Sequence, residues 1–173
     1  MIIEPGVLLV AHPRLPGPVF DRSVVLITEH SASGTVGLVI NKPSPYRLSE
    51  IMSAHGVSYS GSDRIYLGGP VQNRALSILH EEPRSGNVMQ VKSWWVSSDH
   101  KMLVDLADGE ISGCYRAVAG MSGWAPNQLA REIAQDQWLL LPATTERLFG
   151  KTHAAQYAQC LDDCAATAMD QYL

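Results

Sequence analysis

The sequence predicts a single α+β domain that extends over residues 1–173. Short apolar runs rich in β-branched residues follow one another with only turn residues between them, as in hairpins. Helical periodicity separates these runs in only a few places. Paired strands with few helices are typical of an α+β fold rather than a doubly wound sheet. A length of 173 residues is enough to bury one core, and no repeat or linker divides the chain.

The first third of the chain contains three expected strands. Residues 6–11, 23–29 and 35–40 are apolar runs of strand length. The second run holds four consecutive apolar residues, which indicates a strand covered on both faces. Residues 30–34 have the composition of a turn. We therefore expect the second and third strands to form a hairpin with a five-residue loop, ended by the prolines that follow.

The middle of the chain predicts two helices among further strands. Apolar residues at helical spacing run from Leu48 to His55, and Gly56 stands where a C-terminal cap is needed. Asp99 is a suitable N-cap for a second helix, which Gly109 ends. Strand-like segments are expected at residues 65–67, 75–79 and 88–96.

The last third predicts two strands and two helices. Residues 114–119 and 138–141 are short and apolar, as strands are. Pro126 suits the first turn of a helix that continues to about Asp136. From about His153 onward, apolar residues three to four apart indicate a C-terminal helix.

Charge and composition limit the class of protein. Seventeen acidic and 13 basic residues give a net charge of −4, and the basic residues are scattered along the chain. Because proteins that bind the phosphate backbone carry a basic face or tail, direct nucleic-acid binding is disfavoured. We find no signal peptide and no apolar run long enough to cross a membrane. Three cysteines are too few for a disulfide scaffold, so we expect a cytoplasmic protein.

Two sequence patterns resemble catalytic motifs without meeting their requirements. Residues 120–124 read GMSGW, and the nucleophile elbow needs glycine where Trp124 stands. We therefore expect Ser122 to be a hydrogen-bonded turn hydroxyl. The GKT at residues 150–152 resembles the end of a P-loop, but the first glycine of that motif is replaced by Thr145.

Metal binding is considered for His153, Cys160 and Cys164, which share one face of the expected C-terminal helix. Imidazole and thiolate ligands suit zinc, but a single straight helix rarely directs three ligands to one ion. We favour a structural interpretation, in which these residues pack the helix. A redox role for a cytosolic thiol pair stays open as an alternative. The sequence thus predicts no metal and no cofactor.

The remaining candidates for function are polar residues near the ends of strands and on one helix. They are Arg22, Glu29, His30, Asn41, Gln72, His80, Gln128 and Glu132. In a functional interpretation they converge on one cleft, with His30 or His80 as acid or base and Arg22 as an anion anchor. In a structural interpretation, which we favour, they satisfy buried backbone groups or form ion pairs where strands bend.

Several short segments occur in an order that resembles one bacterial family. They are GVLLVAHP at 6–13, FDRSVVLI at 20–27, GLVINKP at 37–43, GGPV at 68–71, LH at 79–80, and SGWAPNQL at 122–129 with Glu132. Together they resemble the YqgE/AlgH family. The resemblance implies a bent, mostly antiparallel sheet that forms a partial barrel flanked by helices. That family has no established enzymatic activity, and part of it is labelled as candidate transcriptional regulators.

The resemblance extends from about Gly6 to Leu141, with two departures. Asn127 stands where the family usually has glycine, and because asparagine tolerates left-handed backbone angles we expect the turn to survive. Met121 replaces a tyrosine of the family, so any role of that hydroxyl is lost. The C-terminal helix is then expected to be peculiar to this branch.

The leading hypothesis is a cytosolic, non-enzymatic protein that binds a protein or a small ligand, with any effect on transcription indirect. The alternative is an enzyme of unknown reaction, hydrolytic or group-transfer, that uses Arg22, His30, Asn41 and His80. Coordinates separate the two, because catalysis needs these side chains to open into one accessible pocket.

Overall fold

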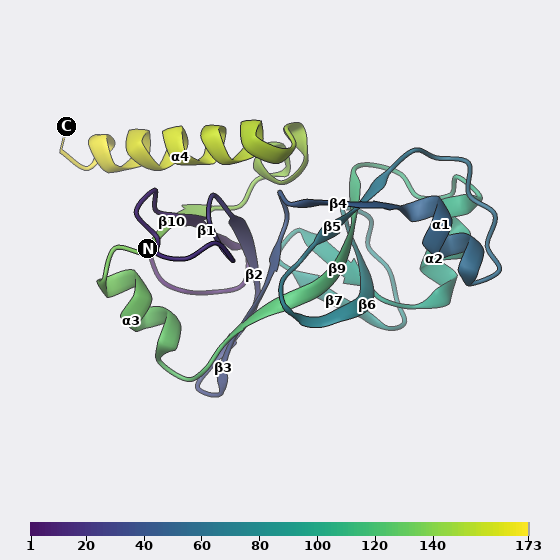
Figure 1. Ribbon diagram of the computed structural model, residues 1–173, viewed down its shortest axis with the longest axis horizontal. Helices are drawn as coiled ribbons and strands as arrows, with labels where there is room; N and C mark the ends of the chain where they lie inside the picture. Colours follow the sequence, from purple (N-terminus) through teal and green to yellow (C-terminus); the bar gives the residue numbers. More distant parts are fainter. Residues whose placement is uncertain (173) are drawn as a thin grey trace.

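A curled sheet of ten strands forms a half-barrel with helices against it in the computed structural model, which describes residues 1–172 (Figure 1). The strands are β1 Val7–Ala11, β2 Val24–Ser31, β3 Gly34–Val39, β4 Pro43–Arg47, β5 Arg64–Leu67, β6 Val71–His80, β7 Val88–Val91, β8 Trp94–Ser97, β9 Tyr115–Trp124 and β10 Trp138–Pro142. The helices are α1 Leu48–Ala54, α2 His100–Ala107, α3 Gln128–Ala134 and α4 His153–Asp170, with a π-helical turn, η1, at Glu146–Gly150. This architecture confirms the predicted α+β class and the partial barrel.

The strands follow the order β10-β1-β2-β3-β9-β6-β8-β7, and β4 joins through β5. Among the described strands, β5 runs parallel to β9 and every other pairing is antiparallel. Strand β9 is the centre of this arrangement, because it pairs with β3, β5 and β6 along its length. It therefore connects the part of the sheet near the N-terminus with the part near α1 and α2 (Figure 1).

Two separate hydrophobic cores lie on opposite faces of the central strands. Successive side chains of a strand point to opposite faces, so neighbours in sequence enter different cores. Ile65, Ile78 and Ala117 belong to the second core. The residue that follows each of them in the sequence, Tyr66, Leu79 or Val118, belongs to the first core.

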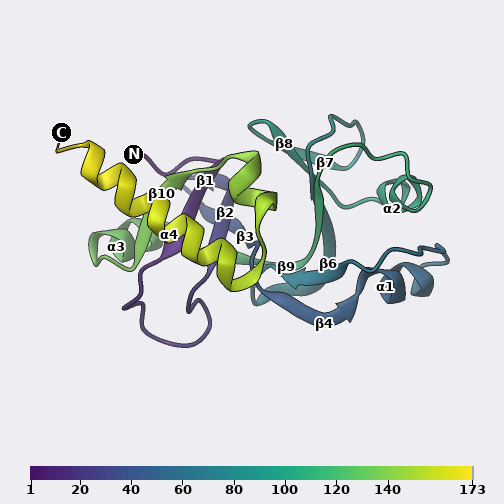
Figure 2. The same cartoon turned by 90° about the horizontal axis from the view of Figure 1, so that it is seen from above.

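The first core is enclosed by the curled sheet and by α4. All five residues of β1 are buried, as are the first five of β2. Figure 2 shows α4 lying across β10, β1 and β2. The Tyr157 hydroxyl donates a hydrogen bond to the carbonyl oxygen of Ala11 at 2.8 Å, and Cys160 is fully buried. The helix thus seals the side of the half-barrel that the strands leave open.

The second core is smaller and is covered by α1 and α2. Leu48 and Met52 of α1 and Met102 of α2 are fully buried there. The carboxylate of Asp99 accepts a hydrogen bond from the backbone N–H of Met102 at 3.0 Å, so it caps α2 as predicted. Both helices are short, which limits how much of this sheet face they cover.

Several predicted boundaries differ from the structure, and the segment expected at residues 88–96 is divided into the two strands β7 and β8. The β2–β3 loop has two residues instead of five, because Ser31 pairs directly with Gly34. Residues 43–47 form β4, although their prolines predict an end to the strand; β4 pairs only with β5, so its prolines lie on a sheet edge. Strand β9 continues through Ser122, which was expected in a turn. The buried Ser122 hydroxyl donates to the carbonyl oxygen of Gly68 at 3.1 Å.

The connection between β5 and β6 requires glycine. Gly69 has a φ of +147°, and a Cβ atom on either Gly68 or Gly69 would collide with the backbone of β9. The chain therefore packs directly against β9 where it reverses.

None of the helices described in residues 1–172 has the length and apolarity needed to cross a bilayer.

Candidate functional site

Asn41 binds backbone groups rather than facing a cleft. Its side-chain oxygen accepts from the N–H of Val24 at 2.8 Å, and its amide donates to the carbonyl oxygen of Arg22 at 2.9 Å. Arg22 has a φ of 52° and an exposed side chain. Asn41 therefore holds the bend that leads into β2, which uses both ends of its amide group.

His80 is fully buried at the end of β6. Its Nε2 lies 2.7 Å from the hydroxyl of Ser97 on the neighbouring β8. Burial lowers the pKa of His80, and the positive charge of Arg84 lowers it further. A neutral imidazole without solvent access packs between strands and is poorly placed for proton exchange with a substrate.

Glu29 and His30 end β2 and point to different sides of it. His30 Nδ1 lies 2.7 Å from the hydroxyl of Thr35, its partner across the β2–β3 hairpin. Glu29 lines a separate hollow of about 270 Å³, together with Val36 and Met121. Adjacent strand residues face opposite sides, so these two side chains do not share a site.

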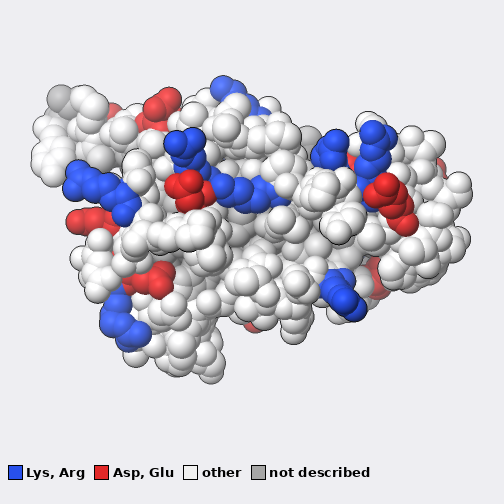
Figure 3. All heavy atoms as spheres, viewed as in Figure 1, with Lys and Arg blue, Asp and Glu red and all other residues white. Residues whose placement is uncertain are grey.

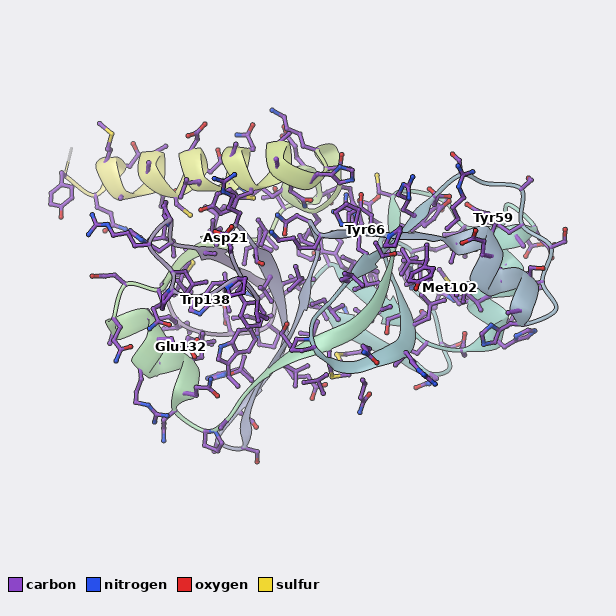
Figure 4. The ribbon with its side chains drawn as sticks, in the orientation of Figure 1. Asp21, Tyr59, Tyr66, Met102, Glu132 and Trp138 are labelled. Atoms are coloured by element: carbon purple, nitrogen blue, oxygen red, sulfur yellow. The ribbon has the colours of Figure 1, made fainter. Side chains whose placement is uncertain are left out.

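Gln128 and Glu132 belong to a cluster around two tryptophans. One oxygen of Glu132 accepts from the indole N–H groups of Trp124 at 2.9 Å and Trp138 at 2.8 Å. Its other oxygen accepts from the Gln128 amide at 2.9 Å. Figure 4 shows Glu132 and Trp138 side by side next to α3. Phe20 stacks on Trp124, and the carboxylate satisfies two buried indoles at the base of α3.

The structure therefore distributes the eight predicted residues among several places. Arg22 meets Asn41, and Gln128 meets Glu132, but these two pairs are separate. Gln72 lies exposed at the start of β6, with a φ of 47°. Within residues 1–172, no three His, Cys, Asp or Glu side chains converge as a metal site requires.

The thiols proposed for the C-terminal helix pack into the first core. Burial raises the pKa of Cys160 to about 11 and of Cys164 to about 12, so both are held as protonated thiols. His153 lies at the exposed start of α4, about two helical turns before Cys160 and about three before Cys164. This arrangement matches the packing role that we favoured for them.

An apolar groove on the face of the second core is a stronger candidate for function. It has a volume of about 290 Å³ and extends between α1 and the strands β4, β5, β6 and β9. Its lining is mainly Ile51, Ile65, Leu67, Leu76 and Ala119, with Tyr46, His55 and Arg74 at the rim. A neighbouring hollow of about 210 Å³ shares four of these residues and continues the groove toward α2.

The groove exists because α1 and α2 leave part of this sheet face uncovered. Leu67, Leu76 and Ala119 each lie two residues from a member of the second core and so face the same side. Tyr46 is 60% exposed and Leu67 is 47% exposed. Figure 3 shows that the surface over β4, β5 and β6 is largely uncharged, with charged side chains around its border.

The polar part of the groove contains an arginine and two histidines. Arg74, His55 and His100 line it together with one acid, Asp99, whose carboxylate already caps α2. Sequence reasoning did not find this groove. The apolar residues of β5 and β6 read as ordinary strand positions, and which of them a helix covers depends on the path of α1.

Comparisons with known proteins support one family. A family model described as AlgH-like matches residues 8–168. The chain is 34% identical to a UPF0301 protein of Methylococcus capsulatus, over 84% of this chain and 83% of the relative. It is 36% identical to a UPF0301 protein of Myxococcus xanthus, over 86% of this chain and 83% of the relative.

Two solved structures share the fold. The solution structure of the AlgH protein from Pseudomonas aeruginosa has a TM-score of 0.76 and 28% identity, covering 93% of this chain and 86% of that one. A crystal structure of a Corynebacterium diphtheriae protein has a TM-score of 0.71 and 27% identity, covering 84% and 79%. The matched residues 8–168 include most of α4. The expectation that this helix is peculiar to one branch is therefore wrong.

Proposed function

The chain belongs to the AlgH-like family, and from that premise we propose that it is a non-enzymatic binding protein whose apolar groove receives a segment of a partner protein. The observation that carries the proposal is the exposure of Tyr46 and Leu67 above a groove that continues the second core. Contiguous exposed apolar surface is characteristic of interaction sites. A groove between a short helix and a sheet suits an extended or helical peptide.

The charges around the groove indicate the chemistry of the partner. Arg74 supplies a positive charge at the rim, beside the imidazoles of His55 and His100, so a carboxylate of a partner can pair with it there. We therefore propose a segment with two or more apolar side chains and at least one Asp or Glu. The apolar side chains would occupy the space beside Ile65 and Leu76, and the acid would pair with Arg74.

A binding role is also supported by the separation of the residues expected to be catalytic. His80 is sealed between strands, Asn41 is occupied by backbone groups, and His30 lies on the β2–β3 hairpin. Catalysis by this set would need them around one substrate. On the face shown in Figure 3, basic and acidic side chains are interspersed, so this face lacks the continuous basic surface that DNA binding uses.

Two further parts of the proposal concern the chain as a whole. We propose one domain, because β5, β6 and β9 contribute to both cores and cannot belong to either alone. We also propose a cytoplasmic protein, since its three cysteines are free and two of them are part of the packed interior.

The test uses a photo-crosslinking amino acid at Tyr46 and, as a matched control, at Val19. Val19 is 65% exposed and lies in the loop before β2, which does not line the groove. An N-terminal tag is suitable for purification, because the N-terminus lies at the opposite end of the molecule from α1 and α2 (Figure 1). Crosslinking is done in the bacterial cell, and the captured peptide is sequenced.

We expect an acidic, apolar segment of one protein to be captured from position 46 and not from position 19. A purified complex should then weaken at least about tenfold in Leu67→Glu and stay unchanged in Val19→Glu, since a buried charge without a partner costs more than 1.4 kcal/mol. Equal capture at both positions, capture of a second copy of this chain, or full binding by Leu67→Glu would each overturn the proposal.

A further inference from the structure

Arg116 of β9 carries a buried charge that has no carboxylate partner in residues 1–172. The residue is 6% exposed. Its Nη1 donates to the carbonyl oxygen of Ile40 at 2.5 Å and to the side-chain oxygen of Gln156 at 2.8 Å. The guanidinium also stacks over the ring of Tyr66, 4.5 Å from its centroid. These neutral groups orient the guanidinium but leave its positive charge uncompensated.

Two other arginines of the protein, in contrast to Arg116, have carboxylate partners. Arg84 pairs with Asp105 at 2.7 Å, and Arg147 pairs with Asp163 at 2.8 Å, although both are more exposed than Arg116. Within residues 1–172, no carboxylate lies within ion-pair distance of Arg116. Burial lowers the pKa of Arg116, because removal from water disfavours the charged form of the guanidinium. A buried charge usually has a partner of opposite sign.

A cavity of about 290 Å³ opens beside this guanidinium. It lies where β5, β9 and the start of α4 meet, close to Tyr66 in Figure 4. Arg116 lines the cavity, and Arg64, His153 and Thr152 lie around it. The His153 ring is 6.0 Å from the ring of Tyr66. The first turn of the 18-residue helix α4 also contains no acid that would occupy its positive end.

Among the described residues, Asp63 is the one acid that lines the cavity, and it is already occupied. Its carboxylate accepts hydrogen bonds from the hydroxyls of Tyr59 and of Tyr115, the latter at 2.9 Å. Burial and the bond to Asp63 raise the pKa of Tyr59, so that hydroxyl stays protonated and keeps donating. Asp63 is thus engaged beside the cavity rather than paired with Arg116, and the balance of charge in the cavity is positive.

We propose that this cavity binds a small oxyanion, such as the phosphate or carboxylate group of a metabolite, with Arg116 as its buried counter-charge. Arg64 and His153 contact the same anion from the exposed side. The cavity shares no lining residue with the apolar groove. The two sites are therefore independent, and the failure of one proposal does not affect the other.

The test measures anion binding to the full chain by isothermal titration calorimetry, with the shift of the unfolding temperature as a second readout. Inorganic phosphate and succinate are the two probes, at constant ionic strength set with potassium chloride. The variants are Arg64→Gln and His153→Gln, whose side chains are exposed, with Arg131→Gln on α3 as the matched control. Arg116→Lys keeps the charge and removes the planar fork, in case Arg116→Gln does not fold.

We expect at least one probe to bind with a stoichiometry of one and to raise the unfolding temperature. Arg64→Gln and Arg116→Lys should each weaken it about tenfold, the loss expected for a charge-assisted hydrogen bond, while Arg131→Gln and Leu67→Glu bind normally. Preference for phosphate or for succinate identifies the ligand group. Absence of binding by both probes, or equal binding by Arg64→Gln and Arg131→Gln, would overturn the proposal.

Discussion

The two cores use the same strands but are closed in different ways. The first core is enclosed by the curl of the sheet and by the 18 residues of α4, whose side chains reach β1 and β2. The second core is covered by α1 and α2, with seven and eight residues. The long helix thus closes the first core along β10, β1 and β2, and a hollow of about 270 Å³ remains beside Val36 and Met121. Partial cover leaves the apolar groove beside the second.

This difference teaches how one sheet supports both stability and recognition. A strand places alternate residues on each face, so β5, β6 and β9 cannot stabilise one face without presenting the other. Where a helix covers the second face of these strands, its side chains form the second core. Beyond the end of α1, side chains of the same face are exposed and can contact a partner. The extent of α1 therefore sets the size of the groove.

The largest expected effect comes from truncating a side chain in each core. Leu26→Ala in the first core and Met102→Ala in the second should each cost about 3 kcal/mol, since both side chains are fully buried. Urea unfolding measures the loss. Hydrogen exchange then compares the cores: Met102→Ala should release the amides of α1 and α2 while β1 and β2 stay protected. Equal release in both cores would show that they open as one unit.

A smaller effect is expected where a carboxylate supports the first core. Glu132→Gln should cost about 1–2 kcal/mol, because two indole N–H groups lose a charged acceptor. The variant should also shift the emission of the tryptophans to longer wavelength. The exposed Glu110 provides the control as Glu110→Gln, for which the free energy of unfolding should stay within about 0.5 kcal/mol. An unchanged stability in Glu132→Gln would mean that the indoles find other acceptors.

The smallest effect concerns pH and the second core. Hydrogen bonds from Lys101 and Arg84 hold the pKa of Asp105 below its ordinary value. The ion pairs therefore stabilise the fold at pH values above about 3.9, the unfolded-state pKa, and are lost as the pH falls through the lower folded-state pKa. Urea midpoints measured from pH 6 down to pH 3 should fall less steeply in Asp105→Asn. Asp162→Asn on α4, an exposed acid, should keep the original slope.

Much of the fold could be predicted from local signals. The run of four apolar residues in β2 and the Asp99 cap of α2 each have a local physical cause that the structure confirms. Asn127 takes the left-handed conformation expected of it, with a φ of 62°. Strand β4 could not be predicted, because a proline-containing strand is stable only where β5 supplies its partner.

The functional surface was harder to predict, because in a sequence polar residues are candidates for chemistry while apolar residues are assigned to the core. In the sequence, His80 and Asn41 are candidates for catalysis. In the structure, Asn41 binds backbone groups, and His80 contacts a serine of the neighbouring strand. Leu67 and Arg116 read as ordinary strand residues. In the structure, Leu67 matters because no described helix covers it, and Arg116 matters because no described carboxylate pairs with it. The sequence near each residue does not reveal such a missing partner.

The alternation along β9 also restricts how the length of this chain can change. Inserting or deleting one residue between 115 and 124 would turn every later side chain to the opposite face, moving Arg116 or its neighbours across the sheet. Loops such as residues 12–23 carry no such constraint. Lineages of this protein should therefore vary in loop length and in side-chain identity, while the ten positions of this strand keep a fixed count.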